Sequence, residues 1–567
     1  MLSLLALPVG VISTAGACLL LAGIRLFTNL FFFQRLSLAY VSPAAHHLGA
    51  WVVAVPALGG LLVGLVARYG SEKVRGHGIP EALEAILFGQ SRMSAKVALL
   101  KPLSSAIAIG SGGPFGAEGP IIMTGGAAAS LLAQAFHLSA AERKALLVAG
   151  ACAGMTAVFG TPLAAILLAV ELLLFELRPR SLLPVALACA VAAFLRPLWA
   201  DAGPLFPLAS AAPSAVAFAS CVVAGLAAGL LSAAMTLALY RVEDWFGRLR
   251  VHWMWWPAIG GLFVGLGGLL QPRALGVGYD VIGDLLQRPA AAAGVLGLLG
   301  AKAAIWTVAL GSGTSGGVLA PLLMIGAGLG RLIGAWLPGG DPGLWALVCM
   351  AATLGGTMRA PLMAVMFAFE LTDDVAALVP AMLACIVAYG FTVTVMPRSI
   401  LTEKIARRGR HVYREYGVDP LERHFVEEVM TAAVVAIPGS MPAAAVLAQY
   451  FGPGQAHRAY PVTDGGRLLG VVSRADLQNL AAEALGRAIS GLVGERALAC
   501  ALPTETCRAV ASRMAAEGLE RLPVVESAGS RLLVGIVSRS DLLKPARQVH
   551  EEESRRERKS RFSRRLR

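Results

Sequence analysis

Charged residues are scarce in this chain, and their scarcity excludes the largest class of proteins. Only 15% of its 567 residues are Asp, Glu, Lys or Arg, whereas 56% are hydrophobic. Soluble domains carry about 25% charged residues, so a soluble globular protein is excluded. The apolar stretches fall between residues 1 and 397 and allow on the order of ten to sixteen helical segments. The sequence predicts a polytopic α-helical protein embedded in a lipid bilayer.

The chain also lacks the motifs of metal centres and of several enzyme classes. Its eight cysteines have neither metal-ligand spacing nor the spacing of a disulfide framework, so no metal site is predicted. It contains no His-Glu-x-x-His motif and no Gly-x-x-x-x-Gly-Lys-Ser/Thr phosphate loop. We therefore predict that the protein is not an enzyme and requires no cofactor, although glycine-rich loops and buried acids also occur in membrane-embedded enzymes.

Positive charge exceeds negative charge by 13, and the location of the excess indicates an orientation. Basic residues follow the last apolar segment, between residues 398 and 410, and fill the C-terminal tail. Because such clusters beside a membrane helix stay in the cytoplasm, we expect a cytoplasmic C-terminal region and, by default, the plasma (inner) membrane. We interpret residues 548–567 as a disordered basic tail that touches anionic lipid, not as a nucleic-acid-binding segment.

A glycine-rich segment occurs twice, 201 positions apart. The two copies begin at Lys101 and Lys302 and stay in register without a gap. A period this long indicates a duplicated half-domain, over about residues 50–200 and 250–400, and not a solenoid. Glycine breaks in apolar segments expose backbone N–H groups, so a pair of them in two halves of a membrane protein predicts a shared ion site.

Three glycine-rich loops have the form of an anion site. They cover residues 76–81, 110–120 and 311–321, and each is followed by an apolar helix. A helix N-terminus carries about half a positive charge and unpaired N–H donors. Glycine leaves room for an anion to approach the backbone. Several such termini that converge within the membrane would bind an anion without a buried lysine or arginine.

The C-terminal region has the hydropathy of a globular domain and contains a second duplication. A pattern of strand, turn, strand and serine-capped helix ends in Ser-Arg-x-Asp-Leu twice, at residues 473–477 and 538–542. The pattern resembles a tandem pair of CBS domains. It predicts a linker at 411–425, a first CBS domain at 426–487 and a second at 488–547.

The aspartate of each Ser-Arg-x-Asp-Leu segment is a candidate ligand-binding residue. The resemblance to CBS domains implies that Asp476 and Asp541 contact the ribose of an adenine nucleotide. In the alternative interpretation, both aspartates only stabilise the first turn of their helices.

Three motifs in the apolar region resemble the signatures of the CLC chloride channels and proton/chloride antiporters. They are Gly76-His77-Gly78-Ile79-Pro80-Glu81, Gly116-Ala117-Glu118-Gly119-Pro120 and Gly316-Gly317-Val318-Leu319-Ala320-Pro321, in the order found in that family. The resemblance covers residues 1–410 and includes the C-terminal CBS pair. It implies two inverted repeats of tilted, broken helices, and a homodimer with one pore per subunit.

The resemblance also assigns roles to residues. Glu118 matches the gating glutamate, because an ionised carboxylate competes with the anion and withdraws when protonated; the alternative is a glutamate that only caps its helix. Backbone N–H groups of Val318 and Leu319 are expected to face the anion. The implied anion-binding positions are Gly76, His77, Gly78, Ile79, Pro80, Gly116, Gly317, Val318, Leu319 and Leu401.

This chain departs from the family pattern at three functional positions. His77 replaces a serine, and its imidazole either donates to the anion or only bonds to the backbone. Leu401 stands where a tyrosine would supply a hydroxyl ligand. Leu172 stands where many antiporters have a proton-transfer glutamate, and a leucine cannot relay protons. The neighbouring Glu171 and its counterpart Glu370 are interpreted as structural acids.

These observations favour passive or weakly coupled permeation of a small monovalent anion, with chloride as the expected ion and Glu118 as the gate. The alternative within the same fold is a proton/anion antiporter that takes protons through water or through His77. A sensor built around the CBS pair is disfavoured, because a receptor has little need for duplicated broken helices.

Overall fold

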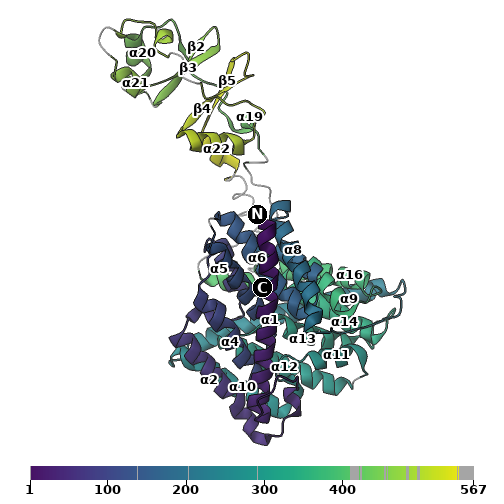
Figure 1. The fold of residues 1–567 in the computed structure, drawn as a ribbon. Coiled ribbons are helices and arrows are strands. Elements are labelled where there is room, and N and C mark those ends of the chain that lie inside the picture. The colour runs from purple at the N-terminus through teal and green to yellow at the C-terminus, as the bar shows by residue number, and fades with distance from the viewer. Residues whose placement is uncertain are drawn as a thin grey trace. The chain divides into compact units, whose positions relative to one another are not determined.

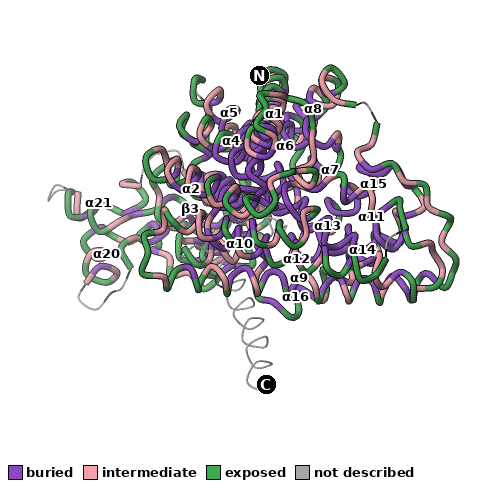
Figure 2. Tube along the Cα trace, turned by 90° about the horizontal axis from the view of Figure 1, so that it is seen from below, coloured by how far each residue is buried: buried purple, intermediate pink, exposed green. Residues whose placement is uncertain are grey.

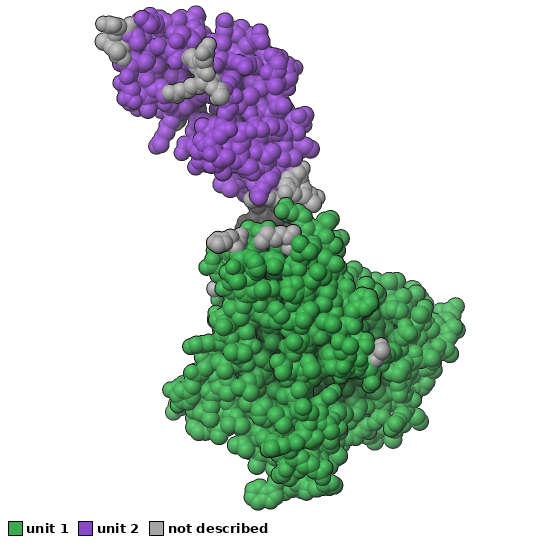
Figure 3. All heavy atoms as spheres, viewed as in Figure 1, with its two compact units in different colours: residues 1–415 green, residues 416–567 purple. Residues whose placement is uncertain are grey.

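The computed structural model describes residues 2–136, 138–201, 203–289, 291–408, 421, 424–452, 455, 457–480, 484–493, 498–545 and 547. The chain forms two compact units, Met1–Glu415 and Tyr416–Arg567, which Figure 3 colours separately. The predicted basic tail at 548–567 lies outside the described residues, as do residues 411–420 of the predicted linker.

Unit 1 is built from helices, which Figure 1 labels. The first half contains α1 (Leu2–Phe33), α2 (Ala54–Tyr69), α3 (Ile79–Leu87), α4 (Ala95–Gly110), α5 (Glu118–Gln134), α6 (Ala140–Phe159), α7 (Pro162–Leu168), the π-helical turn η4 (Ala169–Leu174) and α8 (Pro179–Leu195). The second half contains α9 (Ala217–Gly247), α10 (Trp256–Leu270), α11 (Tyr279–Gln287), α12 (Ala292–Gly311), α13 (Leu319–Ile333), α14 (Pro342–Met358), α15 (Pro361–Thr372), α16 (Leu378–Val395) and α17 (Ile400–Arg407). Short 3-10 turns lie between them, namely η1 (Pro43–Ala45), η2 (Gly49–Val53), η3 (Glu72–Val74), η5 (Arg196–Leu198), η6 (Trp253–Trp255) and η7 (Pro272–Ala274).

The two halves of unit 1 repeat each other element by element. Helices α1 and α9 have 32 and 31 residues, and α3 and α11 have nine each. The repeat therefore includes α1, which precedes the start expected near residue 50. Among the described residues, seven helices are long and apolar enough to cross a membrane. Others, such as α3 and α11, are too short, which confirms the predicted fold of broken helices.

Repeated glycines let α2 and α10 touch backbone to backbone. A Cβ atom on Gly60 would lie 2.1 Å from the carbonyl oxygen of Pro257, and one on Gly261 would lie 2.2 Å from that of Pro56. The Pro-Ala-x-Gly-Gly motif of each half therefore contacts the same motif of the other half. Small residues allow this close approach where lipid provides no hydrophobic drive.

Two glutamates join the halves by capping each other's helices. Glu171 accepts hydrogen bonds from the Leu362 and Met363 amides at 3.2 and 2.8 Å, in the first turn of α15. Glu370 accepts from the Leu163 and Ala164 amides at 2.9 and 2.8 Å, in the first turn of α7. A carboxylate at a helix N-terminus satisfies free donors and opposes the helix dipole. The prediction that these two are structural acids is confirmed.

The interior of unit 1 is formed by α4, α5, α6, α13 and α14, whose buried stretches gather at the centre of Figure 2. Almost every residue of α6 after Lys144 and of α14 is buried. The glycine-rich loops before α3, α5 and α13 end within this interior. Their backbone donors are therefore shielded from water, so they need partners inside the protein.

Unit 2 contains two small sheets that follow the predicted duplication. In the first, β1 (Ile437–Pro438) runs parallel to β2 (Ala459–Asp464), which pairs antiparallel with β3 (Arg467–Ser473). In the second, β4 (Arg521–Val525) pairs antiparallel with β5 (Leu533–Ser538). The accompanying helices are α19 (Val426–Val429), α20 (Ala443–Tyr450), α21 (Arg474–Gln478) and α22 (Cys507–Glu517), with the 3-10 turns η9 (Ile489–Gly491) and η10 (Asp541–Leu543). The strand, turn, strand and helix pattern is confirmed.

Candidate functional site

The carboxylate of Glu118 lies between two helix N-termini. Glu118 is the first residue of α5 and is fully buried. Its Oε1 accepts a hydrogen bond of 2.9 Å from the amide of Ala320, in the first turn of α13, and its Oε2 has no partner among the described residues. The free N–H groups and positive ends of α5 and α13 favour an anion at this point. The carboxylate thus occupies a position suited to a small anion.

Two glycines hold this arrangement together. The Gly317 amide donates to the Gly116 carbonyl at 2.8 Å, and the Gly116 amide donates to the Gly317 carbonyl at 3.3 Å. These bonds form an antiparallel bridge between loops 201 positions apart. A Cβ atom on Gly116 would lie 1.9 Å from Oε2 of Glu118, and one on Gly317 would lie 2.3 Å from it. Only glycine fits at both positions.

The third loop joins the same centre. The amide of Gly76 donates to the Gly313 carbonyl, and the Gly316 amide donates to the Gly76 carbonyl, both at 3.4 Å. Gly78 has a φ of 89°, and a Cβ atom there would lie 2.6 Å from the Gly119 carbonyl oxygen, so glycine is required. The structure therefore brings the three loop motifs predicted from sequence into contact.

His77 is the polar side chain of the third loop. It is 2% exposed, and neither ring nitrogen has a hydrogen-bond partner among the described residues. Within the described part of the chain, no backbone group therefore bonds to the ring of His77, and its contact with the anion stays a prediction. A buried imidazole without a partner has a donor available for a ligand.

The remaining predicted anion-binding positions lie around these loops. Ile79 and Pro80 begin α3, Val318 caps α13 and Leu319 begins it, and all four are buried. Leu401 is buried in α17, where it offers only hydrocarbon. The hydroxyl of Tyr240 in α9 donates to the carbonyl of Ile400, the residue before Leu401. This hydrogen bond joins α17 to α9.

Two buried lysines that open the repeated segments have a role that sequence reasoning did not assign. Lys101 donates to the carbonyls of Val74 and Gly76 at 2.9 and 2.8 Å. Lys302 donates to those of Ala274 and Gly276 at 3.0 and 2.7 Å. Their occurrence at the same position of both copies was the signal that could have revealed this role. Each ammonium group fixes the loop before a short helix, α3 or α11.

The second copy contains a pattern that the sequence analysis missed. Residues 313–317 have the Gly-x-Ser-x-Gly spacing of a hydrolase nucleophile elbow. The hydroxyl of Ser315, however, bonds to those of Ser104 and Ser105 at 3.2 and 2.8 Å. The loop also joins two helices, α12 and α13, whereas an elbow follows a strand. Ser315 therefore fastens the loop to α4.

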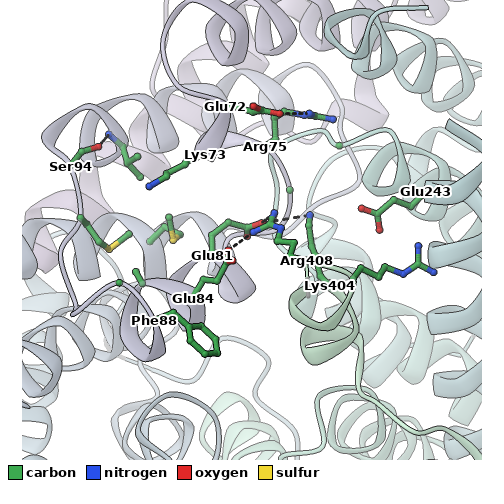
Figure 4. A pocket seen from close by; sticks show the side chains of 18 of the residues that line it. Glu72, Lys73, Arg75, Glu81, Glu84, Phe88, Ser94, Glu243, Lys404 and Arg408 are labelled. Atoms are coloured by element: carbon green, nitrogen blue, oxygen red, sulfur yellow. Dashed lines mark hydrogen bonds and ion pairs between the residues drawn. The ribbon is translucent and has the colours of Figure 1, made fainter. Parts of the chain in front are cut away.

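A cavity of about 660 Å³ reaches the loops from one side, and we call it the Glu81 cavity. It contacts Gly76 and Gly313 and contains several charged side chains, most of which Figure 4 shows: Glu72, Lys73, Arg75, Glu81, Glu84, Arg92, Glu243, Lys404, Arg407 and Arg408. Glu81 pairs with Lys404 at 3.6 Å and with Arg408 at 3.2 Å. Cations outnumber acids in the lining, which favours the entry of anions.

Leu172 lies in the π-helical turn η4 and is fully buried. Its side chain has no group that binds a proton. The position where many antiporters have an acid is thus filled by hydrocarbon.

In unit 2, both candidate aspartates act as helix caps. Asp476 accepts from the amide and hydroxyl of Ser473 at 2.9 and 2.6 Å, and Asp541 accepts from the same groups of Ser538 at the same distances. Asp541 also pairs with Lys544 at 2.7 Å. Partial burial raises the pKa of Asp541, but hydrogen bonds from Lys544 and Ser538 outweigh it and lower that pKa below its usual value. Both residues therefore stabilise the first turn of their helices, and their contact with a nucleotide stays a prediction.

We expect Gly317→Ala to destabilise the protein by about 1–3 kcal/mol, because the added Cβ would collide with Glu118 and with the Gly116 carbonyl. Anion flux from proteoliposomes should fall as well. The control is Gly300→Ala in α12, where a Cβ would meet open space and helix propensity would rise. Equal melting temperatures and equal flux for the two variants would contradict the described packing.

Comparison with known proteins agrees with this architecture. The model of the voltage gated chloride channel family matches residues 59–393, and that of the CBS domain matches residues 426–483 and 494–546. A putative chloride channel protein ClcB-like of Ralstonia nicotianae is 32% identical over 346 residues, which are 59% of this chain and 81% of that protein. The voltage-gated ClC-type chloride channel ClcB of Salmonella dublin is 33% identical over 377 residues, which are 64% of this chain and 88% of that protein.

Solved structures share the fold. A slow cyanobacterial Cl⁻/H⁺ antiporter superposes with a TM-score of 0.63 at 21% identity, over 72% of this chain and 97% of its own. A eukaryotic CLC transporter superposes with a TM-score of 0.60 at 20% identity, over 95% of this chain and 97% of its own. From its matched residues and its paired loops, the chain belongs to the voltage gated chloride channel family and carries two C-terminal CBS domains.

Proposed function

We propose that the protein transports chloride across the bilayer along a path through the three glycine-rich loops, with Glu118 as the gate. The observation that carries this proposal is the contact between the Glu118 carboxylate and the Ala320 amide. A negatively charged group already occupies the meeting point of two helix N-termini. A chloride ion can bind the same donors only when that group leaves.

The energetics of the site follow from its burial. An ionised carboxylate without water is costly unless donors surround it, and one oxygen of Glu118 has no partner among the described residues. Protonation removes the charge and weakens the bond to Ala320, so the side chain can withdraw. Chloride then takes the vacated N–H groups, including those of Val318 and Leu319, and His77 adds a side-chain donor. Access to the path therefore rises as the pH falls.

The Glu118→Gln variant tests the gate. Glutamine is neutral at every pH, so we expect chloride flux in the variant to be independent of pH and to match the acid-pH flux of the wild type. Wild-type flux should rise by up to about tenfold for each unit by which the pH falls while Glu118 titrates. Chloride efflux from proteoliposomes across a pH series measures both, with the exposed Glu526→Gln of unit 2 as the control. A pH response that survives in Glu118→Gln would disprove this assignment.

Passive or weakly coupled permeation is the form of transport that the geometry favours. Leu172 is buried hydrocarbon, so no carboxylate there can pass protons. The alternative is a proton/chloride antiporter that moves protons through water or through His77, and one fold neighbour is such an antiporter. No enzymatic activity is proposed.

Simultaneous recording of chloride efflux and external pH separates the two forms. We expect the chloride gradient to dissipate without moving protons, because the side chain of Leu172 has no titratable group. A protonophore added at the end provides the control, since it reports any proton gradient formed. Proton uptake in a fixed ratio, driven uphill by the chloride gradient, would instead establish the antiporter.

We also propose that the protein is a homodimer with one pore per subunit. Large apolar side chains are exposed on α8, α15 and α16, including Leu183, Leu362 and Ile386. Such a surface has to be covered by lipid or by a second subunit. The family resemblance supports a second copy over part of it, in the plasma (inner) membrane, with the CBS pair in the cytoplasm.

We propose that unit 2 binds an adenine nucleotide between its CBS domains. Binding would change the chloride flux, and α17 would transmit the change. Asp476 fits this role better than Asp541, because its carboxylate is exposed, whereas that of Asp541 is engaged by Lys544. The nucleotide would supply a ribose and phosphates, and Asp476 would bind the ribose hydroxyls.

Calorimetry with ATP, ADP and AMP on the full chain tests this proposal. We expect Asp476→Asn to weaken binding by about tenfold or more, since a hydrogen bond to a charged group contributes about 1.5–3 kcal/mol. Asp464→Asn, at the exposed end of β2, is the control. If neither ATP, ADP nor AMP binds to the wild type, the proposal is wrong.

A further inference from the structure

Arg75 directly precedes the glycine-rich loop at 76–81 and lines the Glu81 cavity. Its guanidinium lies against the loop at 311–321, because a Cβ atom on Gly313 would lie 2.9 Å from Nη2. The amide of Gly76, the next residue, donates to the Gly313 carbonyl at 3.4 Å. The guanidinium therefore lies where the cavity meets two of the three loops.

Neighbouring side chains fix the guanidinium of Arg75 and leave one of its edges free. Its central carbon lies 4.5 Å from the ring centroid of Trp253 and 5.7 Å from that of Trp256. Nη1 donates to the Glu72 carboxylate at 3.1 Å, a pair that Figure 4 shows, and Nε is buried. Nη2 has no hydrogen-bond partner among the described residues, yet it is not buried, and the side chain is 20% exposed. Nη2 is thus a fixed donor that a ligand in the cavity can reach.

The equivalent position in the second half shows that packing alone does not require a guanidinium. Leu275 precedes Gly276 as Arg75 precedes the corresponding glycine of the first half. A Cβ atom on Gly112 would lie 3.4 Å from Cδ2 of Leu275, and the Gly276 amide donates to the Gly112 carbonyl at 3.0 Å. Hydrocarbon therefore fills the equivalent place beside the equivalent glycine. The charge of Arg75 needs an explanation other than packing.

The two tryptophans beside Arg75 also have aliphatic counterparts. The Pro-Ala-x-Gly-Gly motif aligns Trp253 with Val52 and Trp256 with Val55. The guanidinium and both indoles thus occur together in one half of unit 1, and aliphatic side chains replace all three in the other half. An indole face stabilises a cation without neutralising its charge. A guanidinium held in this way still attracts an anion.

We propose that Nη2 of Arg75 binds chloride in the Glu81 cavity, one step before the anion enters the glycine-rich loops. The order of these steps rests on the proposed chloride transport. A guanidinium N–H is a charge-assisted donor, and cations outnumber acids in the lining of this cavity. Arg75 is therefore an anion-binding residue at one end of the path, and Leu275 leaves the second half without an equivalent.

The charges around Arg75 make this site a weak one. Glu72 and Glu243 are the acids that act on it electrostatically, and Arg408 is the neighbouring cation. The Glu72 side chain is 67% exposed, so water and salt screen its charge, although it still binds Nη1. Weak binding suits a transport path, because an anion has to leave each site as well as enter it.

Isotopic chloride exchange in proteoliposomes, at equal chloride concentrations on both sides, tests the site whichever way the protein inserts. We expect Arg75→Leu, which copies the second half, and Arg75→Gln to raise the half-saturating chloride concentration by about threefold or more, because each removes the charged donor. Maximal exchange should change by less than about twofold, and the pH dependence that Glu118 sets should persist. Arg92→Gln is the control, since Arg92 lines the same cavity but is exposed between α3 and α4.

Titration calorimetry with chloride on the purified full chain separates this site from the proposed transport. We expect a saturable chloride-binding step in the wild type that is at least about threefold weaker in Arg75→Leu and unchanged in Arg92→Gln. Melting temperatures verify folding, and Arg75→Gln decides the matter if Arg75→Leu does not fold. Absence of exchange in the wild type would refute the proposed transport, and the calorimetric comparison would still decide the site. Absence of a binding step in the wild type, equal affinity in both Arg75 variants and the wild type, or an equal loss in Arg92→Gln would overturn the proposal.

Discussion

The antiparallel bridge between Gly116 and Gly317 is the contact on which the site depends. It joins two loops that are 201 positions apart and directs the N-termini of α5 and α13 at one point. Two positive helix ends facing each other inside a protein repel one another unless an anion lies between them. The carboxyl group of Glu118 lies at this point and accepts a hydrogen bond from the Ala320 amide. The carboxylate and the two helix ends are therefore a single electrostatic arrangement, and Gly116 and Gly317 are necessary because a Cβ atom on either would collide with the carboxylate.

Several other buried or half-buried charges of unit 1 bind the backbone. Lys101 and Lys302 each bind two carbonyls, and Glu171 and Glu370 each bind two amides of the opposite repeat. These pairings compensate the cost of burial and fix the loops and short helices. Glu118 differs because one of its oxygens is left without a protein partner among the described residues. This incomplete pairing distinguishes the acid proposed to move from the acids that stay.

The duplicated architecture also gives different chemistry to two cavities at equivalent positions, the Glu81 cavity and a cavity of about 540 Å³ that Arg196 and Val277 line. Gly76-His77-Gly78 in the first half corresponds to Gly276-Val277-Gly278 in the second, and each segment lines or adjoins a cavity. In the first half, the buried imidazole of His77 follows Gly76, which lines the charged Glu81 cavity. In the second half, Val277 and Tyr279 line a more apolar cavity. The same backbone scaffold therefore borders one highly charged cavity and one more apolar cavity.

The sequence by itself determined the class of protein, the duplication, the CBS pair and the identity of the loop residues. Composition excludes a soluble fold, and glycine spacing in register over the two copies requires a common local backbone. Sequence also indicated that Glu171 and Glu370 are structural, although not which amides they bind. Only the tertiary structure decided that the ring of His77 has no hydrogen-bond partner among the described residues, that Lys101 and Lys302 bind loop carbonyls, and that Ser315 bonds to Ser104 and Ser105. Those contacts join residues from separate segments of the chain, and no local pattern encodes which distant backbone group a buried side chain will meet once the helices pack.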